Sequence, residues 1–487
     1  MTYFDLGTFS RRLENTPYEA QIWFDRGLIW QYGFNHEEAI ACYERVLELE
    51  PSNVMARFPT DPEITDYGPW NDDFATAMRR VYETFPDDLD VIAIFVEALI
   101  NRTPWALWDT RTGQPAAGSS AEEARAALDC AFTTQPAAWE HPGLLHFYIH
   151  LMEMSSTPEI ALPHADQLVR LVPDSGHLVH MATHIDVLCG DYQKVVARNR
   201  QAAQVDRSYF DHAGGENFYT VYRIHNLHFQ IYGAMFLGRP SDAFEAARAL
   251  VENLPEPVVR YMPEMFEAFA PMKLHVLIRF GRWSCILEEA FPEDAELYSY
   301  STVLMHYART VALSNLGRIP QAEESASLFA AARDAVQPER MLFNNPCADI
   351  LKVAEAMMLG ELHYKSGRVL EGLDLLRRAV DLDDNLLYDE PWGWMQPTRH
   401  ALGALLMDAE RYAEAEAVYR ADLGLDATLP RPCQHPRNVW SLHGLLECLS
   451  RSDEAVEISH VRQQLDGALA HVEVPIIASC ACRSAPR

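Results

Sequence analysis

The chain has 487 residues, of which 48% are hydrophobic, and its 70 acidic and 40 basic side chains give a formal net charge of −30. Such a length exceeds one compact core, and the apolar content excludes an intrinsically disordered chain. A negative field of this size repels phosphate groups, so nucleic acid and anionic membrane surfaces are disfavoured as partners.

The N-terminal residues 1–16 contain neither an apolar signal core nor a small-residue cleavage site. No run in the sequence approaches the ~18 apolar residues that a membrane-spanning helix needs. The nine cysteines are too sparse for a disulfide scaffold, and without a secretory signal we expect them to stay reduced. These features together predict a cytoplasmic protein.

Residues 20–51 follow the spacing of a ~34-residue helix-hairpin repeat. The positions that match the repeat are Trp23, Gly27, Trp30, Ala39, Tyr43 and Pro51. Small residues at such positions let two helices approach closely, and aromatic rings fill the space beside them. This stretch resembles a repeat of the tetratricopeptide superfamily, and the resemblance implies a fold of stacked helix hairpins.

Later in the chain, a short turn signal that usually begins with glycine recurs after apolar stretches of helical period. It lies at residues 190–192, 238–240, 281–283, 317–319, 367–369 and 410–412. With the unit that ends at Pro173, this pattern predicts roughly eight hairpins. We therefore expect an all-α, right-handed superhelical solenoid with a concave groove. An α/β enzyme fold is unfavourable because no strand pattern alternates with the helices.

We predict a single solenoid over residues 1–487. Its parts are N-terminal repeats with an irregular insert (1–130), histidine-rich central repeats (131–290), C-terminal repeats (291–470) and a cysteine-containing tail (471–487). The proline-rich stretch from 53 to 120 is the least regular part of the chain. We expect a loop or an inserted helix there.

Nine of the 19 histidines lie between residues 146 and 228, and seven of these nine recur in register with the repeats. His146 and His150 are four residues apart, and His180 and His184 repeat that spacing 34 residues later. Residues four apart share one face of a helix. Equivalent or adjacent positions on the same faces carry Glu153, His177, His225 and His228.

In the tetratricopeptide superfamily these positions line the concave groove, and the resemblance implies the same here. Axes of neighbouring helices lie about 8–10 Å apart, so imidazoles from successive repeats can converge on one or two ions. The predicted metal ligands are His146, His150, His177, His180, His184, His225 and His228. Imidazole suits copper, zinc or iron and not calcium or magnesium. Copper is favoured, since two ions with about three imidazoles each resemble a coupled dicopper centre.

The main functional hypothesis is a metal-dependent oxidoreductase that acts on a small organic substrate. In a hydrolytic variant, Glu153 is the catalytic base beside a metal-bound water. One alternative is a non-catalytic scaffold that binds a peptide or protein partner in the groove, and another is metal storage or sensing. The fold alone favours the scaffold, whereas seven imidazoles in register favour the metal enzyme.

Several stretches are also similar to a group of large bacterial and fungal tetratricopeptide-like proteins with a histidine-rich groove. They are residues 32–39, 146–150, 176–181, 225–229 and 479–483. The sequence departs from that group after Arg57, where a further helical segment usually follows. In the tail, Cys480 and Cys482 can either add thiolate ligands or guard a redox state.

Overall fold

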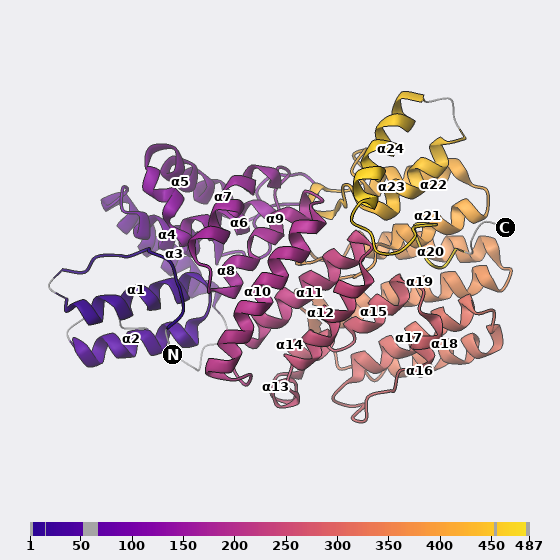
Figure 1. Cartoon of the computed structure of the whole chain (residues 1–487), viewed down its shortest axis with the longest axis horizontal. Coiled ribbons are helices and arrows are strands. Elements are labelled where there is room, and N and C mark those ends of the chain that lie inside the picture. Colours follow the sequence, from indigo (N-terminus) through magenta and orange to yellow (C-terminus); the bar gives the residue numbers. More distant parts are fainter. Residues whose placement is uncertain (1–2, 15, 52–66, 452–454, 484–487) are drawn as a thin grey trace. The chain divides into compact units, whose positions relative to one another are not determined.

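The computed structural model in Figure 1 describes residues 3–14, 16–51, 67–451 and 455–483. The chain divides into two compact units, one formed by Met1–Asp186 with Arg198–Gly214 and the other by Val187–Ala197 with Gly215–Arg487. Among the described residues, regular structure is helical except for one isolated bridge and the antiparallel pair β1 (Met341–Leu342) and β2 (Asn345–Pro346). The predicted all-α architecture of helix hairpins is thereby confirmed.

The first unit consists of short helices in successive pairs. They are α1 (Tyr18–Tyr32), α2 (His36–Leu49), α3 (Gly68–Thr84), α4 (Leu89–Ile100), α5 (Ala121–Thr134), η1 (Pro136–Glu140), α6 (Pro142–Glu153), η2 (Pro158–Ala161), α7 (Leu162–Leu171) and α8 (Gly176–His180). Helices α9 (Ala182–Leu188) and α10 (Tyr192–Ala213) contribute residues to both units.

In the hairpin of α1 and α2, close helix packing accounts for the small and aromatic residues at the repeat positions. A side chain at Gly27 would place its Cβ 2.7 Å from Cε1 of the Tyr43 ring, so the two helices can pack this closely only with glycine there. In the described part of the irregular stretch, residues 67–120, the helices α3 and α4 pack together and a loop follows them from 101 to 120. The predicted departure after Arg57 lies outside the described residues.

The second unit continues the hairpins. Its helices are α11 (Thr220–Leu237), α12 (Pro240–Glu252), α13 (Glu256–Tyr261), α14 (Pro263–Phe266), η3 (Glu267–Phe269), α15 (Met272–Arg279), α16 (Trp283–Glu288), α17 (Ser299–Asn315), α18 (Ile319–Arg333), α19 (Cys347–Lys365), α20 (Val369–Asp383), α21 (Thr398–Asp408), α22 (Tyr412–Asp422), η4 (Arg431–Cys433), α23 (Val439–Leu449) and α24 (Ala455–Leu469).

All six turn signals of the sequence are confirmed, because each one ends on the first residue of a helix: α10, α12, α16, α18, α20 or α22. The first residue of every signal has a left-handed φ between 59° and 88°. Glycine adopts this conformation without strain and occupies five of the six positions. Glu410 is the exception, with φ 59°.

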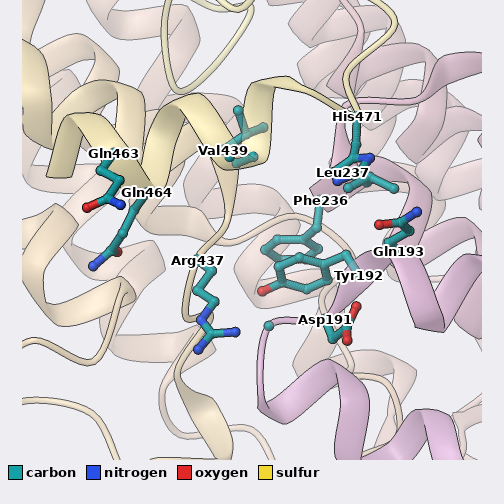
Figure 2. A pocket seen from close by; sticks show the side chains of 13 residues that line it. Asp191, Tyr192, Gln193, Phe236, Leu237, Arg437, Val439, Gln463, Gln464 and His471 are labelled. Carbon is teal, nitrogen blue, oxygen red and sulfur yellow. The ribbon is translucent and has the colours of Figure 1, made fainter. Parts of the chain in front are cut away.

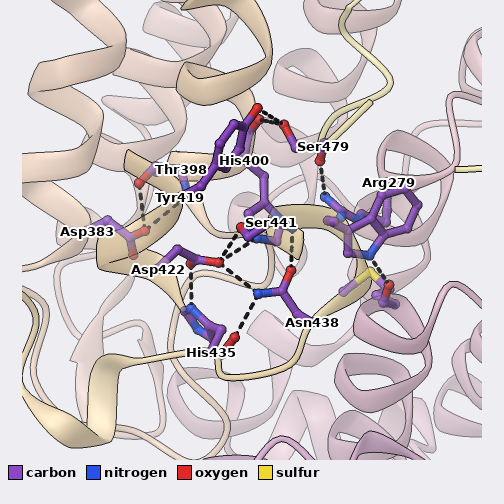
Figure 3. Close-up of polar contacts among 12 residues, drawn as sticks. Arg279, Asp383, Thr398, His400, Tyr419, Asp422, His435, Asn438, Ser441 and Ser479 are labelled. Carbon is purple, nitrogen blue, oxygen red and sulfur yellow. Dashed lines mark hydrogen bonds and ion pairs between the residues drawn. The ribbon is translucent and has the colours of Figure 1, made fainter. Parts of the chain in front are cut away.

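A buried carboxylate joins the last hairpins of the second unit (Figure 3). Asp422, at the end of α22, accepts hydrogen bonds from His400 Nε2 at 3.0 Å and from His435 Nδ1 at 2.8 Å. Asn438 Nδ2 and Ser441 Oγ also donate to it. Burial alone would raise the pKa of Asp422, but the two imidazoles hold it well below its usual range. The ionised carboxylate therefore organises the loop between α22 and α23.

We expect Asp422→Ala to lower the free energy of unfolding by about 3–5 kcal/mol, because it leaves several buried polar groups without their acceptor. Urea denaturation followed by circular dichroism measures this loss. Asp426→Ala, at an exposed position just beyond α22, is the matched control and should change stability by less than about 0.5 kcal/mol. Equal stability of both variants would contradict the role given to Asp422.

Candidate metal centre

Five of the predicted histidine ligands come from three helices of the first unit. His146 and His150 lie on α6, His177 and His180 on α8, and His184 on α9. The backbone at the start of α8 approaches the carboxylate of Asp206, and a Cβ on Gly176 would lie 1.9 Å from that residue's Oδ1. Glycine at this position thus allows the histidine-bearing turn to pack closely.

The five imidazoles form one contiguous cluster. Ring centroids are 4.8 Å apart for His146 and His150, 5.1 Å for His146 and His177, and 5.9 Å for His177 and His180. The corresponding distances are 4.8 Å for His180 and His184 and 5.6 Å for His150 and His184. One ring nitrogen from each of His146, His150 and His177 lies within 4.8 Å of the other two. The sequence register therefore correctly predicts that these side chains converge.

Glu153 lies between two of these rings. His150 Nδ1 donates to its Oε1 at 2.8 Å, and His184 Nδ1 donates to its Oε2 at 2.5 Å. Burial acts to raise the pKa of this carboxyl, but the facing His184 and His150 lower it to about 2. Both oxygens are engaged by imidazole donors, so this geometry favours a positioning role for Glu153 over that of a base.

The other two oriented rings donate their Nδ1 protons to uncharged oxygens. His146 Nδ1 lies 2.6 Å from the backbone oxygen of Tyr32, and His180 Nδ1 lies 2.6 Å from Asn199 Oδ1. Metal-binding histidines are commonly oriented in this way, by a carboxylate or carbonyl on the nitrogen that does not bind the ion. In four of the imidazoles, Nδ1 is thus held by an oxygen, and Nε2 is the ring nitrogen that remains for a metal ion to bind.

The surroundings of the Nε2 atoms indicate metal binding. Those of His146 and His150 are buried and have no hydrogen-bond partner among the residues that the structure describes. Those of His180 and His184 face each other at 2.8 Å. With both Nδ1 atoms protonated, the facing atoms are two lone pairs, which repel each other. Burial lowers the pKa of His180 well below the usual range, so a shared proton is unfavourable, whereas a cation can bind both lone pairs.

The expectation that these histidines line an open groove is wrong. His146 and His180 are completely buried, and only His150 has a partly exposed side chain, at 18%. Phe34, in the turn between α1 and α2, packs over the rings, with centroids 4.6 Å from His146 and 5.3 Å from His177. Sequence reasoning missed Phe34 and Asn199 as parts of the site. For Phe34 alone, the sequence offered an indication, because it lies in the stretch 32–39 that resembles proteins with a histidine-rich groove.

His225 and His228 lie on α11 and belong to the second unit. The His225 ring packs edge-on against Phe343 at 5.0 Å, and His228 Nε2 lies 2.8 Å from the sulfur of Met395. Burial lowers the pKa of His228 to about 3, so the ring is neutral at physiological pH.

A cavity of about 520 Å³ is a separate candidate site in the second unit (Figure 2). Its lining includes the stacked pair Tyr192 and Phe236, whose ring centroids are 4.9 Å apart and which are almost fully buried. Arg437, Gln463 and Gln464 provide polar groups in the same lining. A cavity with such guanidinium and amide groups over an apolar floor is suited to binding a peptide segment.

Comparisons with known proteins agree with the hairpin architecture. The family model described as a tetratricopeptide repeat matches residues 20–53. No curated protein matches the chain. Among the described residues, no helix combines the length and the apolar character that crossing a membrane requires.

Similar solved structures include the Cut9–Hcn1 hetero-tetramer of the APC/C, with 14% identity, 94% coverage of this chain and 74% of that chain, and a TM-score of 0.29. A human IFIT1 dimer with m7Gppp-AAAA has 12% identity, coverage of 94% and 91%, and a TM-score of 0.31. Scores this low carry no argument about this chain. The match of the family model identifies residues 20–53 as similar to a tetratricopeptide repeat, and the other described hairpins share the all-α architecture.

We expect Glu153→Gln to weaken transition-metal binding by about 10–100-fold, because the amide no longer accepts from both His150 and His184. Isothermal titration with Cu²⁺ or Zn²⁺ measures the affinity, and far-ultraviolet circular dichroism checks the fold. Glu140→Gln, an exposed glutamate at the end of η1, is the control and should bind as the wild type does. Unchanged affinity in Glu153→Gln would show that the carboxylate does not position the ligands.

Proposed function

We propose that this protein binds a transition-metal ion in the first unit of a tetratricopeptide-like helical repeat. The supporting observation is the set of four imidazoles, from His146, His150, His180 and His184, whose Nδ1 atoms are all oriented by oxygen acceptors. The Nε2 atoms of His146 and His150 are buried without a hydrogen-bond partner among the described residues, and those of His180 and His184 lie 2.8 Å apart. A transition-metal ion would give these ring nitrogens a common partner.

The residues present fit a borderline or soft transition metal. Nitrogen ligands with one carboxylate nearby favour copper, zinc or iron and do not suit calcium or magnesium. We favour copper, in line with the sequence-based expectation. His177 lies close enough to His146 and His150 to serve as a further ligand. The assignment of His225 and His228 to the same centre stays a prediction.

Bound copper would supply one-electron redox chemistry. An oxidoreductase activity on a small organic molecule, in the cytoplasm, is the part of the proposal that depends on metal binding. The chain's own contribution is to hold the four Nδ1 protons and to cover the rings with Phe34, which excludes bulk water. Burial also lowers the pKa of His146, His180 and His184, which favours their neutral, metal-binding form. Glu153 acts on the centre through His150 and His184.

The second candidate function is a scaffold that binds a peptide or protein partner. The tetratricopeptide repeat at residues 20–53 favours it, and so does the cavity around Tyr192 and Phe236. This function needs no metal, so it becomes the better explanation if the histidines bind none. The cavity lies in the second unit and the histidine cluster in the first, so substitutions can test these two sites separately.

Protein purified without chelator or histidine tag, or reconstituted with copper, should hold about one or two transition-metal ions per chain. Elemental analysis gives the stoichiometry, and X-ray absorption should show nitrogen-dominated coordination. His150→Ala and His184→Ala should each reduce the metal content strongly, whereas His460→Ala, an exposed histidine on α24, should not. Less than about a tenth of an equivalent after loading with copper, iron and zinc would overturn the proposal.

The stability of the metal-free protein should decrease as the pH falls below about 6.5. Burial lowers the pKa of His146 and His180 well below the usual range, whereas histidine in the unfolded chain titrates near ~6.5. The unfolded state therefore binds protons first, which favours unfolding as the pH decreases. Bound metal should oppose this loss until protons displace it at about pH 5.

Melting temperatures of metal-free and loaded protein, measured across pH, test this linkage. The two curves should separate above about pH 6 and converge below about pH 5. Curves that superimpose at every pH would mean that these imidazoles hold no metal.

A further inference from the structure

The C-terminal tail is a packed part of the second unit. Ser479 Oγ lies 2.7 Å from the Tyr419 hydroxyl and donates to the backbone oxygen of His400 at 2.8 Å (Figure 3). Arg483 makes two hydrogen bonds to the carboxylate of Glu447, at 2.6 and 2.8 Å. These contacts lie on either side of Cys480 and Cys482, so the fold holds the two cysteines in a defined place.

The two cysteines form a disulfide with one residue between them, so the expectation that all nine cysteines stay reduced is wrong for this pair. The tail places the two sulfurs side by side, whereas the other seven cysteines are thiols. Cys482 is completely buried, whereas Cys480 is partly exposed. Glu361, on α19, has only 1% exposure, and one of its carboxylate oxygens and both sulfurs lie within 4.8 Å of one another. A buried acid thus lies beside one sulfur that solvent reaches and one that it does not.

The surroundings of this pair favour proton exchange. Glu361 accepts a hydrogen bond from Asn315 Nδ2 at 3.0 Å, and burial raises the pKa of its carboxyl to about 7. A group with such a pKa can both donate and accept a proton near neutral pH. Arg279 Nη1 donates to the backbone oxygen of Ser479, which helps to hold the residue before Cys480 in place.

We propose that Cys480 and Cys482 are a thiol–disulfide exchange site for small thiols and disulfides, with Glu361 as the proton donor and acceptor for Cys482. The partly exposed Cys480 is the sulfur that external thiolates attack. The disulfide pairing itself argues against permanent metal ligation by these two sulfurs. The site lies wholly in the second unit and does not depend on the histidine cluster.

Reduction by a dithiol balances in two steps. One thiolate of the dithiol attacks Cys480 Sγ, the bond between the two cysteines breaks, and the Cys482 thiolate takes a proton from the Glu361 carboxyl. In the mixed disulfide, one sulfur of the dithiol is bonded to Cys480. The second thiolate of the same dithiol then attacks that dithiol sulfur, Cys480 leaves as a thiolate that takes a proton from water, and the dithiol becomes a cyclic disulfide. Two electrons pass to the protein, and Glu361 regains its proton from water.

The test incubates the folded wild-type chain with dithiothreitol, or with reduced and oxidised glutathione, and then counts alkylated cysteines by peptide mass spectrometry. The pair should interconvert between dithiol and disulfide while the protein stays folded. Cys482→Ser should form a mixed disulfide between Cys480 and glutathione. Cys480→Ser should react at Cys482 at least about tenfold more slowly, because burial excludes the reagent.

Glu361→Gln should slow exchange in both directions by about tenfold or more at pH 7, without changing the melting temperature greatly. Glu355→Gln, on the same helix, is its matched control, and Cys130→Ser removes an exposed thiol outside the pair. A disulfide that opens only on unfolding would make the pair structural and overturn the proposal. Equal reactivity of Cys480 and Cys482, or stoichiometric zinc bound by the reduced pair, would also overturn it.

Discussion

A buried, ionised carboxylate held by imidazole N–H groups is the interaction on which both units depend. An isolated carboxylate is costly to bury, and an imidazole N–H compensates for that cost only when its position is fixed. Glu153 accepts from His150 and His184, and Asp422 accepts from His400 and His435. In each unit, one acid therefore fixes rings that come from different helices or loops.

The two clusters differ in size and in what their outer ring nitrogens meet. His435 places Nε2 at 3.0 Å from the Tyr232 hydroxyl, so protein groups complete its hydrogen bonding. His150 Nε2 is buried without such a group among the described residues, and the Nε2 atoms of His180 and His184 face each other. His400 Nδ1 in the Asp422 cluster is also buried without a partner among the described residues, so the two clusters differ chiefly in the number of imidazoles gathered. Five converge in the first unit, which is why we propose a cation there and a structural role for the Asp422 cluster. The same chemistry serves stability in one unit and a candidate site in the other.

The hairpin repeat makes both arrangements accessible. Short helices joined by left-handed turns bring side chains with equal register onto neighbouring faces. A polar side chain that such a fold buries needs a hydrogen-bond partner, which often comes from another repeat. The tail illustrates this, because Ser479 and Arg483 find theirs on α21, α22 and α23 and so place the cysteine pair beside Glu361 on α19.

The sequence by itself determined the helix hairpins, the six turns and the convergence of the first five histidines. These features depend on local conformation and on helical spacing, which neighbouring residues specify. Only the tertiary structure decided that Phe34 covers the rings, that Tyr32 and Asn199 orient them, and that Glu361 lies beside the cysteines. Such contacts join residues far apart in the chain, and their distances follow from helix packing, which periodicity does not encode.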